Sequence, residues 1–167
     1  QRTERILIKP GHSNFKACHR LCSQARKLGN CVVYALRQRF FAKESFFTRT
    51  ELDKFVRTHS AEDYRAMPSA ASAQRQVLIA FEQMQGWSKA MASYKQQPEK
   101  FQGKPNLPGY KKKYRTFIIN RNGYKIENHR LYLTGGKEYG FPPLKIRCCE
   151  TQAFNAKINE TVVGDVR

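Results

Sequence analysis

The acidic residues of this 167-residue chain are the first place to look for catalysis, because a Mg²⁺-dependent nuclease holds its ions with clustered carboxylates. Here the acids are scattered along the sequence. Four of them fall in a predicted helical surface and are typical helix complements: Glu51, Asp53, Glu62 and Asp63. Asp165 has only two residues after it, and no phosphate-cradling Gly-x-x-x-x-Gly-Lys loop occurs. We therefore expect no catalytic site within these residues.

Cysteine and histidine do not suggest a stronger site. The five cysteines are an odd number, and we expect free thiols in a reducing compartment. Cys18, His19 and Cys22 stand on one predicted helical turn and could supply two or three zinc ligands. Cys148 and Cys149 would have to complete that site from far along the chain. We favour core packing for the helical cysteines and expect neither a metal nor another cofactor.

The strongest chemical signal is positive charge. Thirty-one Lys and Arg against 13 Asp and Glu give a net charge of +18, which favours a polyanionic partner. Half of it, +9, lies in residues 104–147, where eleven basic residues stand against Glu127 and Glu138. No apolar run approaches the roughly 20 residues that span a bilayer. We therefore favour nucleic acid over a membrane and expect a cytoplasmic, nucleoid-associated protein.

Aromatic residues alternate with the cations of this segment, which suits phosphate neutralisation by the charges and base stacking by the rings. Residues 105–109, Pro-Asn-Leu-Pro-Gly, are stiff and should hold the lysine run that follows in one place. A charge run alone is more often a solvated face. The predicted nucleic-acid-binding residues are Lys104, Tyr110, Lys111, Lys112, Lys113, Tyr114, Arg115, Lys125, Arg130, Arg37 and Arg39.

Two long amphipathic helices are predicted to carry or position these side chains. Ser13 is the expected N-cap of the first, whose apolar positions recur at three- and four-residue steps to about residue 36. The second begins near Ser69 and continues to about residue 94. Its aromatic and methionine positions have the spacing of a helix core rather than of a base-stacking platform. A capping box, Thr48 with Glu51, predicts a shorter helix between them.

Strands are predicted on either side of the helices. Residues 5–9 predict a short strand that ends at a Pro-Gly turn, and a Pro- and Gly-rich boundary begins at Gln97. Further strands are predicted at residues 116–119, 124–126, 131–133, 144–147 and 156–166. Asn122-Gly123 predicts a hairpin because both residues tolerate positive φ. This order predicts an α+β fold, with the helices inserted into a small split β-barrel or sandwich that includes the first strand.

A series of short segments follows a characteristic order along nearly the whole chain. They are Leu21-Cys22, residues 25–30 and 36–40, Met67-Pro68-Ser69, residues 74–78, residues 105–113, Phe117 and residues 131–133. In order and spacing they resemble the N-terminal half of the TnpB/OrfB family of RNA-guided nucleases, to which compact type V CRISPR effectors are similar. The resemblance implies a wedge domain, a β-barrel split between residues 1–11 and 104–167, with a helical recognition domain inserted at residues 12–103.

The same resemblance implies what these parts bind. They would hold the scaffold of a guide RNA and read a short motif beside a double-stranded DNA target, while RNA pairing supplies most of the sequence specificity. Arg can bond guanine and Asn or Gln can bond adenine, each in two places. The implied motif-reading residues are Gln74, Arg75, Gln76, Asn120, Arg121 and Asn122. For Asn120 to Asn122, an ordinary turn is the alternative.

In that family a RuvC-like nuclease domain, with three acids and a zinc-binding insert, follows the wedge. The chain ends at Arg167, so we expect it to be a piece of a longer, transposon-associated endonuclease, with Mg²⁺ needed only by that further domain. Two alternatives stay open. One is a cleavage-free RNA-guided DNA-binding repressor or transposition accessory, and the other is an unrelated basic RNA-binding structural protein of ribosomal type.

Overall fold

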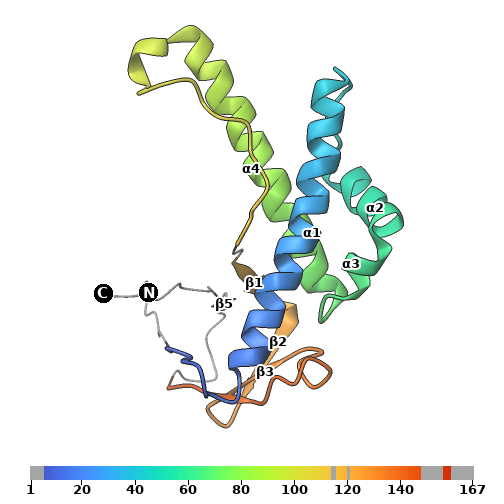
Figure 1. The fold of residues 1–167 in the computed structure, drawn as a ribbon, viewed down its shortest axis with the longest axis vertical. Helices are drawn as coiled ribbons and strands as arrows, with labels where there is room; N and C mark the ends of the chain where they lie inside the picture. The colour runs from blue at the N-terminus through green and yellow to red at the C-terminus, as the bar shows by residue number, and fades with distance from the viewer. Residues whose placement is uncertain (1–5, 114–115, 120, 148–155, 159–167) are drawn as a thin grey trace.

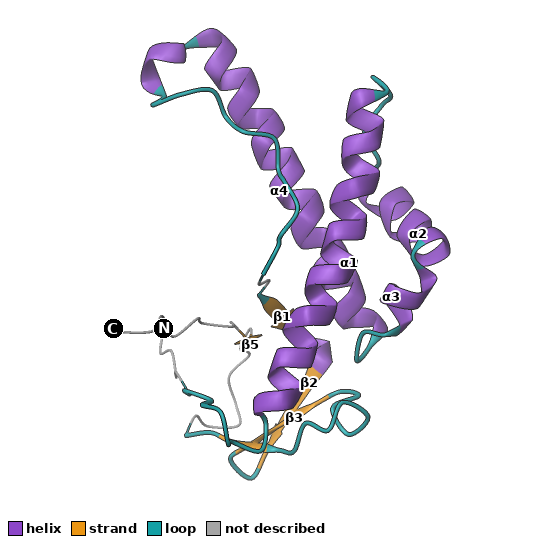
Figure 2. Cartoon of the chain, viewed as in Figure 1, coloured by secondary structure: helices purple, strands orange, loops and turns teal. Residues whose placement is uncertain are grey.

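A helical part lies against two small antiparallel sheets in the computed structural model of the chain (Figure 1). The structure describes residues 6–113, 116–119, 121–147 and 156–158. Two long helices, α1 (Phe15–Phe41) and α4 (Ala70–Gln96), pack on each other, and α2 (Arg49–His59) and α3 (Ala61–Arg65) lie beside them. Figure 2 shows helices in most of the molecule and strands at one end. The expectation of an α+β fold is confirmed.

Helix α1 begins one residue later than predicted, because Asn14 and not Ser13 is its N-cap. The Asn14 side chain makes no capping bond. Its amide instead donates to the carbonyl oxygen of Pro142 at 2.7 Å and accepts from the Ser13 hydroxyl at 3.1 Å, and the residue is fully buried. A tertiary contact has therefore taken over the polar group that would otherwise cap the helix.

Both other predicted helix starts are confirmed. The Thr48 hydroxyl accepts from the backbone N–H of Glu51 at 3.3 Å, and the Glu51 carboxylate accepts from the backbone N–H of Thr48 at 2.8 Å. That second bond lowers the pKa of Glu51. At α4, the Ser69 hydroxyl accepts from the backbone N–H of Ser72. The predicted core stripe of α4 is confirmed in its first part, where the residues from Ala73 to Met84 are buried and Phe81 and Trp87 pack partly against the core. Met91 and Tyr94, at the end of the stripe, are half-exposed and do not join that core.

The strands form two separate sheets. In one, β1 (Phe117–Ile119) pairs antiparallel with β5 (Ala156–Ile158). The other has the antiparallel order β2 (Tyr124–Glu127), β3 (Arg130–Leu133) and β4 (Leu144–Lys145). Within the described ranges these strands do not close into a barrel, so the split-barrel architecture expected from the sequence is not observed.

The predicted first strand is also not found in the part that the structure describes. Residues 6–9 have no strand geometry and pair with neither sheet. Ile6 and Leu7 are exposed, Leu7 at 67% of its surface, and only Ile8 packs partly against the core. An apolar, β-branched run favours a strand only when a sheet edge is available to pair with it.

The predicted Asn-Gly hairpin is wrong in position. Asn122 and Gly123 lie in a 3₁₀ turn, η2 (Arg121–Gly123), which joins β1 and β2, and these strands belong to different sheets. Gly123 serves close packing instead, since a Cβ there would lie 2.6 Å from Cγ2 of Ile119. The two-residue hairpin is at Asn128 and His129, between β2 and β3, where both residues have positive φ (49° and 55°), as the favoured tight turn requires.

One hydrophobic core runs through both parts. Leu21, Leu28 and Leu36 of α1 are fully buried with Phe117 and Ile119 of β1. The helical segment predicted as an insertion and the strands that follow it therefore share their core.

A glycine fixes a further contact between the two parts. At Gly135, φ is +70° and a Cβ would lie 2.0 Å from the carbonyl oxygen of Pro68, which precedes α4. Nearby, the Tyr139 hydroxyl donates to the carbonyl oxygen of Ala66, and the guanidinium of Arg20 lies over the Tyr139 ring. The loop after β3 is thus docked on the corner between α3 and α4.

Candidate nucleic-acid interface

The segment 104–113, here called the lysine strap, returns from the far end of α4 to β1 alongside the long helices (Figure 1). Four side chains bind its backbone. From α4, the Trp87 indole N–H donates to the carbonyl oxygen of Pro105 at 3.1 Å. From α1, Arg37 donates to the carbonyl of Pro108 at 3.0 Å and Arg26 to the carbonyl of Lys112 at 2.7 Å. The fourth is Asn30, which makes two bonds.

Asn30 pairs with Lys111 much as a neighbouring strand would. Its side-chain N–H donates to the carbonyl oxygen of Lys111 at 3.0 Å, and its Oδ1 accepts from the backbone N–H of Lys111 at 2.9 Å. One half-exposed asparagine therefore satisfies both backbone polar groups of a strap residue. The lysine run is held in place, as the proline-rich sequence before it predicted, but helix α1 supplies the main attachment.

The spacing of the α1 residues matches an extended strap. Arg26, Asn30 and Arg37 stand at steps of four and seven residues, which place them on one helical face. Asn30 and Arg37 are about 10 Å apart along the helix axis, and three extended residues from Pro108 to Lys111 span about the same length. The strap therefore lies antiparallel to α1, in register with these side chains.

The side chains of the strap lysines are left available by this arrangement. Lys111, Lys112 and Lys113 are exposed, and within the described residues none of them forms an ion pair with an acid. Lys104 is exposed as well. The backbone is bound on its inner side while the ammonium groups face solvent, which is the geometry of a surface that neutralises phosphates.

The two predicted arginines of α1 have different surroundings. The Arg37 guanidinium lies 5.4 Å from the ring centre of Phe41 and 5.6 Å from that of Tyr110, in addition to its bond to the strap. Arg39 lies 3.7 Å over the Phe47 ring and pairs with Glu44 at 3.3 Å. Arg39 therefore holds the loop between α1 and α2, and its charge is already matched, so Arg37 is the better candidate for binding.

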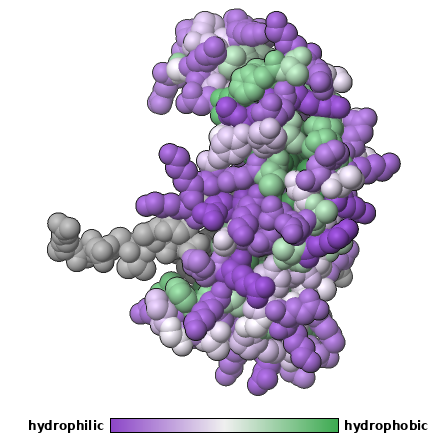
Figure 3. Space-filling view, turned by 45° about the vertical axis from the view of Figure 1, so that its right-hand side comes forward, coloured by the Kyte–Doolittle hydropathy of each residue, from purple (hydrophilic) through white to green (hydrophobic). Residues whose placement is uncertain are grey.

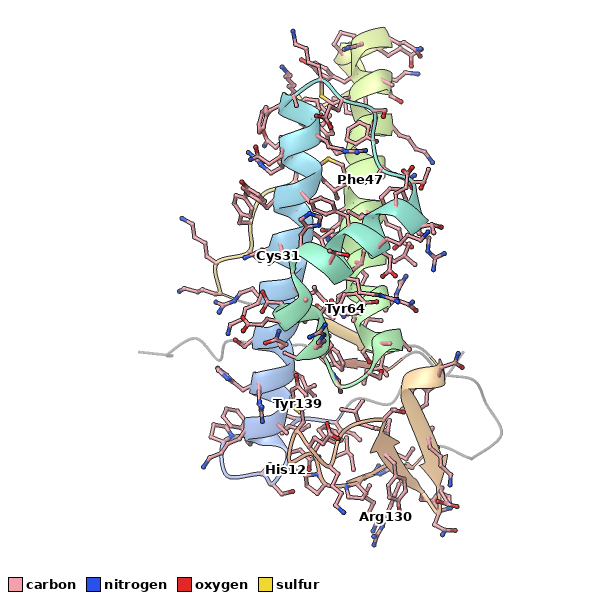
Figure 4. The ribbon with its side chains drawn as sticks, turned by 90° about the vertical axis from the view of Figure 1, so that its right-hand side faces the viewer. His12, Cys31, Phe47, Tyr64, Arg130 and Tyr139 are labelled. Carbon is pink, nitrogen blue, oxygen red and sulfur yellow. The ribbon has the colours of Figure 1, made fainter. Side chains whose placement is uncertain are left out.

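Lys125 and Arg130 belong to a different surface from the strap. Lys125 pairs with Glu127 on the same strand at 3.1 Å. Arg130 is exposed and stands opposite Lys145 in the β3–β4 register and opposite Glu127 in the β2–β3 register, so one like and one opposite charge flank it. Figure 4 shows Arg130 projecting from the sheet end, away from the helices. The structure thus separates these predicted residues from the lysines of the strap.

The predicted motif-reading residues are only partly brought together. Gln74 at the start of α4 and Asn122 of η2 are both exposed, and α4 packs against η2. Arg75 pairs with Glu82 at 3.3 Å. Asn120, Tyr114 and Arg115 lie outside the described residues, as does the side chain of Arg121.

Gln76 does not fit the role predicted for it. It is fully buried, its side-chain N–H donates to the carbonyl oxygen of Ile118 at 3.5 Å, and its Oε1 has no partner among the described residues. No base edge can reach it in this packing. The helical period explains the difference, because Gln76 stands three residues after Ala73 and one before Val77, on the face that packs against β1.

Two of the three α1 cysteines pack in the core as predicted, and Cys31 does not. Cys18 and Cys22 are buried, as expected, and burial raises the pKa of the Cys18 thiol to about 11. Cys31 is half-buried, its thiol donates to the Asp63 carboxylate at 3.4 Å, and burial is the main cause of its raised pKa. Among the residues that the structure describes, no three His, Cys, Asp or Glu side chains gather as a metal site would require. Cys148 and Cys149 lie outside those residues.

Two structural roles escaped prediction, those of Asn30 and Arg26. Neither residue is among those that the sequence predicted to bind nucleic acid. The available signal was Asn30 itself, because asparagine is a poor residue for a helix interior and its presence there favours a side chain with a specific partner.

No helix within the described ranges is long and apolar enough to cross a bilayer. The helices that support the strap are instead amphipathic, with a buried apolar face, and their outer faces are basic in α1 and mainly uncharged and polar in α4. The chain matches no protein-family model, and comparisons with curated proteins and with solved structures found no significant match.

Proposed function

We propose that this chain grips the sugar–phosphate backbone of a guide RNA, as the RNA-holding and DNA-contacting half of an RNA-guided endonuclease of the TnpB type. The observation that carries the proposal is the lysine strap. Its backbone is fixed to α1 and α4 by side-chain hydrogen bonds, and three adjacent exposed lysines have no acidic partner among the described residues.

Fixing the strap matters for affinity. Ordering one backbone residue costs roughly 1–2 kcal/mol, and a free lysine-rich loop would incur that cost on binding. Here Asn30, Arg26 and Arg37 have already ordered the segment. The release of counterions from RNA can then appear almost fully as binding free energy. A lysine run that only faces solvent needs no such attachment. The attachment therefore favours a binding role over an ordinary solvated surface.

The assignment to the TnpB type rests on the order of the sequence segments. In this proposal the helices of residues 12–103 form the recognition part and the small sheets belong to the wedge part. Gln74 and Asn122, exposed on elements that pack together, would contact base edges of the motif beside the DNA target. Pairing with the RNA would supply the remaining specificity.

The strap is tested by replacing Lys111, Lys112 and Lys113 together with alanine and measuring RNA affinity across a salt series. Each phosphate contact to single-stranded nucleic acid contributes about 0.7 to the slope of log affinity against log salt, so three lost contacts should lower the slope by about 2. A charge-matched control replaces three exposed lysines at the far end of the helical part, Lys89, Lys95 and Lys100. An equal slope in the strap variant and the parent chain would refute the proposal.

The DNA-contacting role is tested separately with Asn122→Ala in the complete guide-RNA complex. If Asn122 contacts a base edge, its loss should relax the preference for one motif sequence by about 1–3 kcal/mol at one position. Gln74→Ala should do the same at a neighbouring position. A uniform loss of affinity over all DNA sequences would make these residues backbone contacts instead.

A further inference from the structure

Three aromatic rings of α1 and the lysine strap are exposed: Tyr34, which also borders a hollow between α1 and α2, Phe41, which packs edge-on against Phe40, and Tyr110 of the strap itself. Tyr34 is 56% exposed, Phe41 59% and Tyr110 48%. The two α1 residues continue the outer face that binds the strap, because positions 30, 34, 37 and 41 follow one another at steps of four, three and four. We call Tyr34, Phe41 and Tyr110 the aromatic stripe.

Arg37 links two members of the stripe. Its guanidinium lies 5.4 Å from the ring centre of Phe41 and 5.6 Å from that of Tyr110, within the range of cation–π attraction. The same guanidinium donates to the carbonyl of Pro108, which fixes its position. The rings are therefore held by a fixed cation rather than by burial, and a large part of their surface remains in contact with water.

The stripe borders the unpaired charges of the strap. Tyr110 is directly followed by Lys111, Lys112 and Lys113, all of them exposed. The space-filling view shows hydrophobic residues at the helical end of the molecule next to strongly hydrophilic ones (Figure 3). A matching partner must present flat apolar faces and closely spaced negative charges. An unpaired nucleotide has both, whereas a base-paired duplex hides the faces of its bases.

We propose that the aromatic stripe stacks unpaired bases of the RNA whose phosphates bind the lysine strap. This inference rests on the proposed RNA-binding function and specifies its substrate class as a single-stranded segment. Tyr34 and Phe41 stand two helical turns apart, about 10 Å along the axis, so the stripe offers stacking positions to more than one base. Stacking of this kind tolerates any base sequence, because each base has a π-face.

The test compares two ligands and one ring at a time. Binding of a fluorescein-labelled single-stranded RNA 12-mer (roughly one site of this class) and of a blunt RNA duplex is measured by anisotropy for the full chain and for Tyr34→Ala, Phe41→Ala and Tyr110→Ala. Loss of a stacking ring weakens single-strand binding by about fivefold or more, with the salt slope unchanged. Duplex affinity should stay as in the parent chain. Leu7→Ala is the control, since Leu7 is 67% exposed and lies before α1, outside the stripe.

An abasic single strand identifies the base as the partner of the ring. Removing the bases should weaken binding to the parent chain, but should have a much smaller effect in a variant with Tyr34, Phe41 and Tyr110 all replaced by alanine, since the two losses then concern the same contacts. Independent, additive losses would overturn the inference. Ring variants that weaken binding of the single strand and of the duplex equally, or of neither, would also overturn it.

Failure of the proposed function has a different signature. If the proposed function is wrong, the triple lysine variant keeps the salt slope of the parent chain, or the parent chain binds neither the single-stranded RNA nor the duplex. If the lysine variant lowers the slope while every ring variant leaves single-strand binding unchanged, only the stacking inference is wrong.

Discussion

The substitution Asn30→Ala tests whether the fixed conformation of the strap contributes to RNA binding independently of its charge. The substitution removes two hydrogen bonds to the backbone of Lys111, each worth about 0.5–1.5 kcal/mol. Because Asn30 is half-exposed, water can replace part of these two hydrogen bonds. We therefore expect the free energy that holds the strap on α1 to fall by about 1 kcal/mol. Alanine is the better helix former, so α1 should gain roughly half a kcal/mol. Global stability should therefore stay nearly constant while the strap loosens.

The expected consequence is weaker RNA binding without a change in electrostatics. Binding must now order the released strap, and about 1 kcal/mol corresponds to a loss of about fivefold in affinity. The slope of log affinity against log salt should stay as in the parent chain, because all three lysines remain. Anisotropy titrations over a salt series measure both quantities. Amide exchange at Lys111, whose N–H is bonded to Asn30, measures the release directly.

Asn106→Ala is the control, since Asn106 is an exposed asparagine of the same strap. It should leave the exchange rate of Lys111 and the RNA affinity unchanged. Faster exchange at Lys111 with undiminished affinity in Asn30→Ala would refute the reasoning, because strap order would then not contribute to binding. A reduced salt slope would show that the substitution acts through charge instead.

Three further predictions concern stability, each measured by denaturant unfolding. Gly135→Ala should cost at least about 2 kcal/mol, because its φ is positive and the new Cβ would meet the carbonyl oxygen of Pro68; a neutral effect would contradict the described loop docking. Thr48→Ala should cost about 1 kcal/mol by opening the capping box, with Glu51→Gln milder. Stability should fall as pH rises from 9 to about 11, since the unfolded chain loses the Cys18 proton first; Cys18→Ala should flatten this dependence.

Local patterns predicted the helices well. The capping box at Thr48 and the N-cap at Ser69 depend on residues three apart in sequence, so they need no knowledge of the rest of the fold. Helical period also predicted which residues share the buried face of α4 from Ala73 to Met84. It could not predict where the packing partners end, so Met91 and Tyr94 on the same stripe are half-exposed. Gln76 is a different case, since its motif-reading role was implied by the resemblance, whereas its position in the helical period places it on the inner face.

Strand pairing was harder, because it depends on partners far away in the sequence. Asn122-Gly123 has the residues of a tight hairpin, but β1 pairs with β5, so the turn joins two sheets. Asn128 and His129 form the real hairpin without glycine, since asparagine and histidine also tolerate positive φ. Ile6 and Leu7 have strand-forming side chains and no described strand to pair with. In each case tertiary contacts overrode a local preference.

The sequence predicted the lysines of the candidate site, but not the contacts that hold them in place. The density of lysine around residue 111 is visible in the sequence, whereas the bonds from α1 join residues more than 70 positions apart. The exposure of Tyr34 and Phe41 likewise depends on what packs against α1, and no sequence period distinguishes them from core aromatics.

Trp87 gives this protein a built-in optical signal. It is the chain's single tryptophan; its indole N–H is bonded to Pro105 at the start of the strap, and its ring meets Phe40 edge-on at 5.1 Å. Detaching the strap would expose the indole to water and shift its emission to longer wavelength, with no label attached. RNA titrations followed at that wavelength would then report whether the strap stays seated as the ligand arrives.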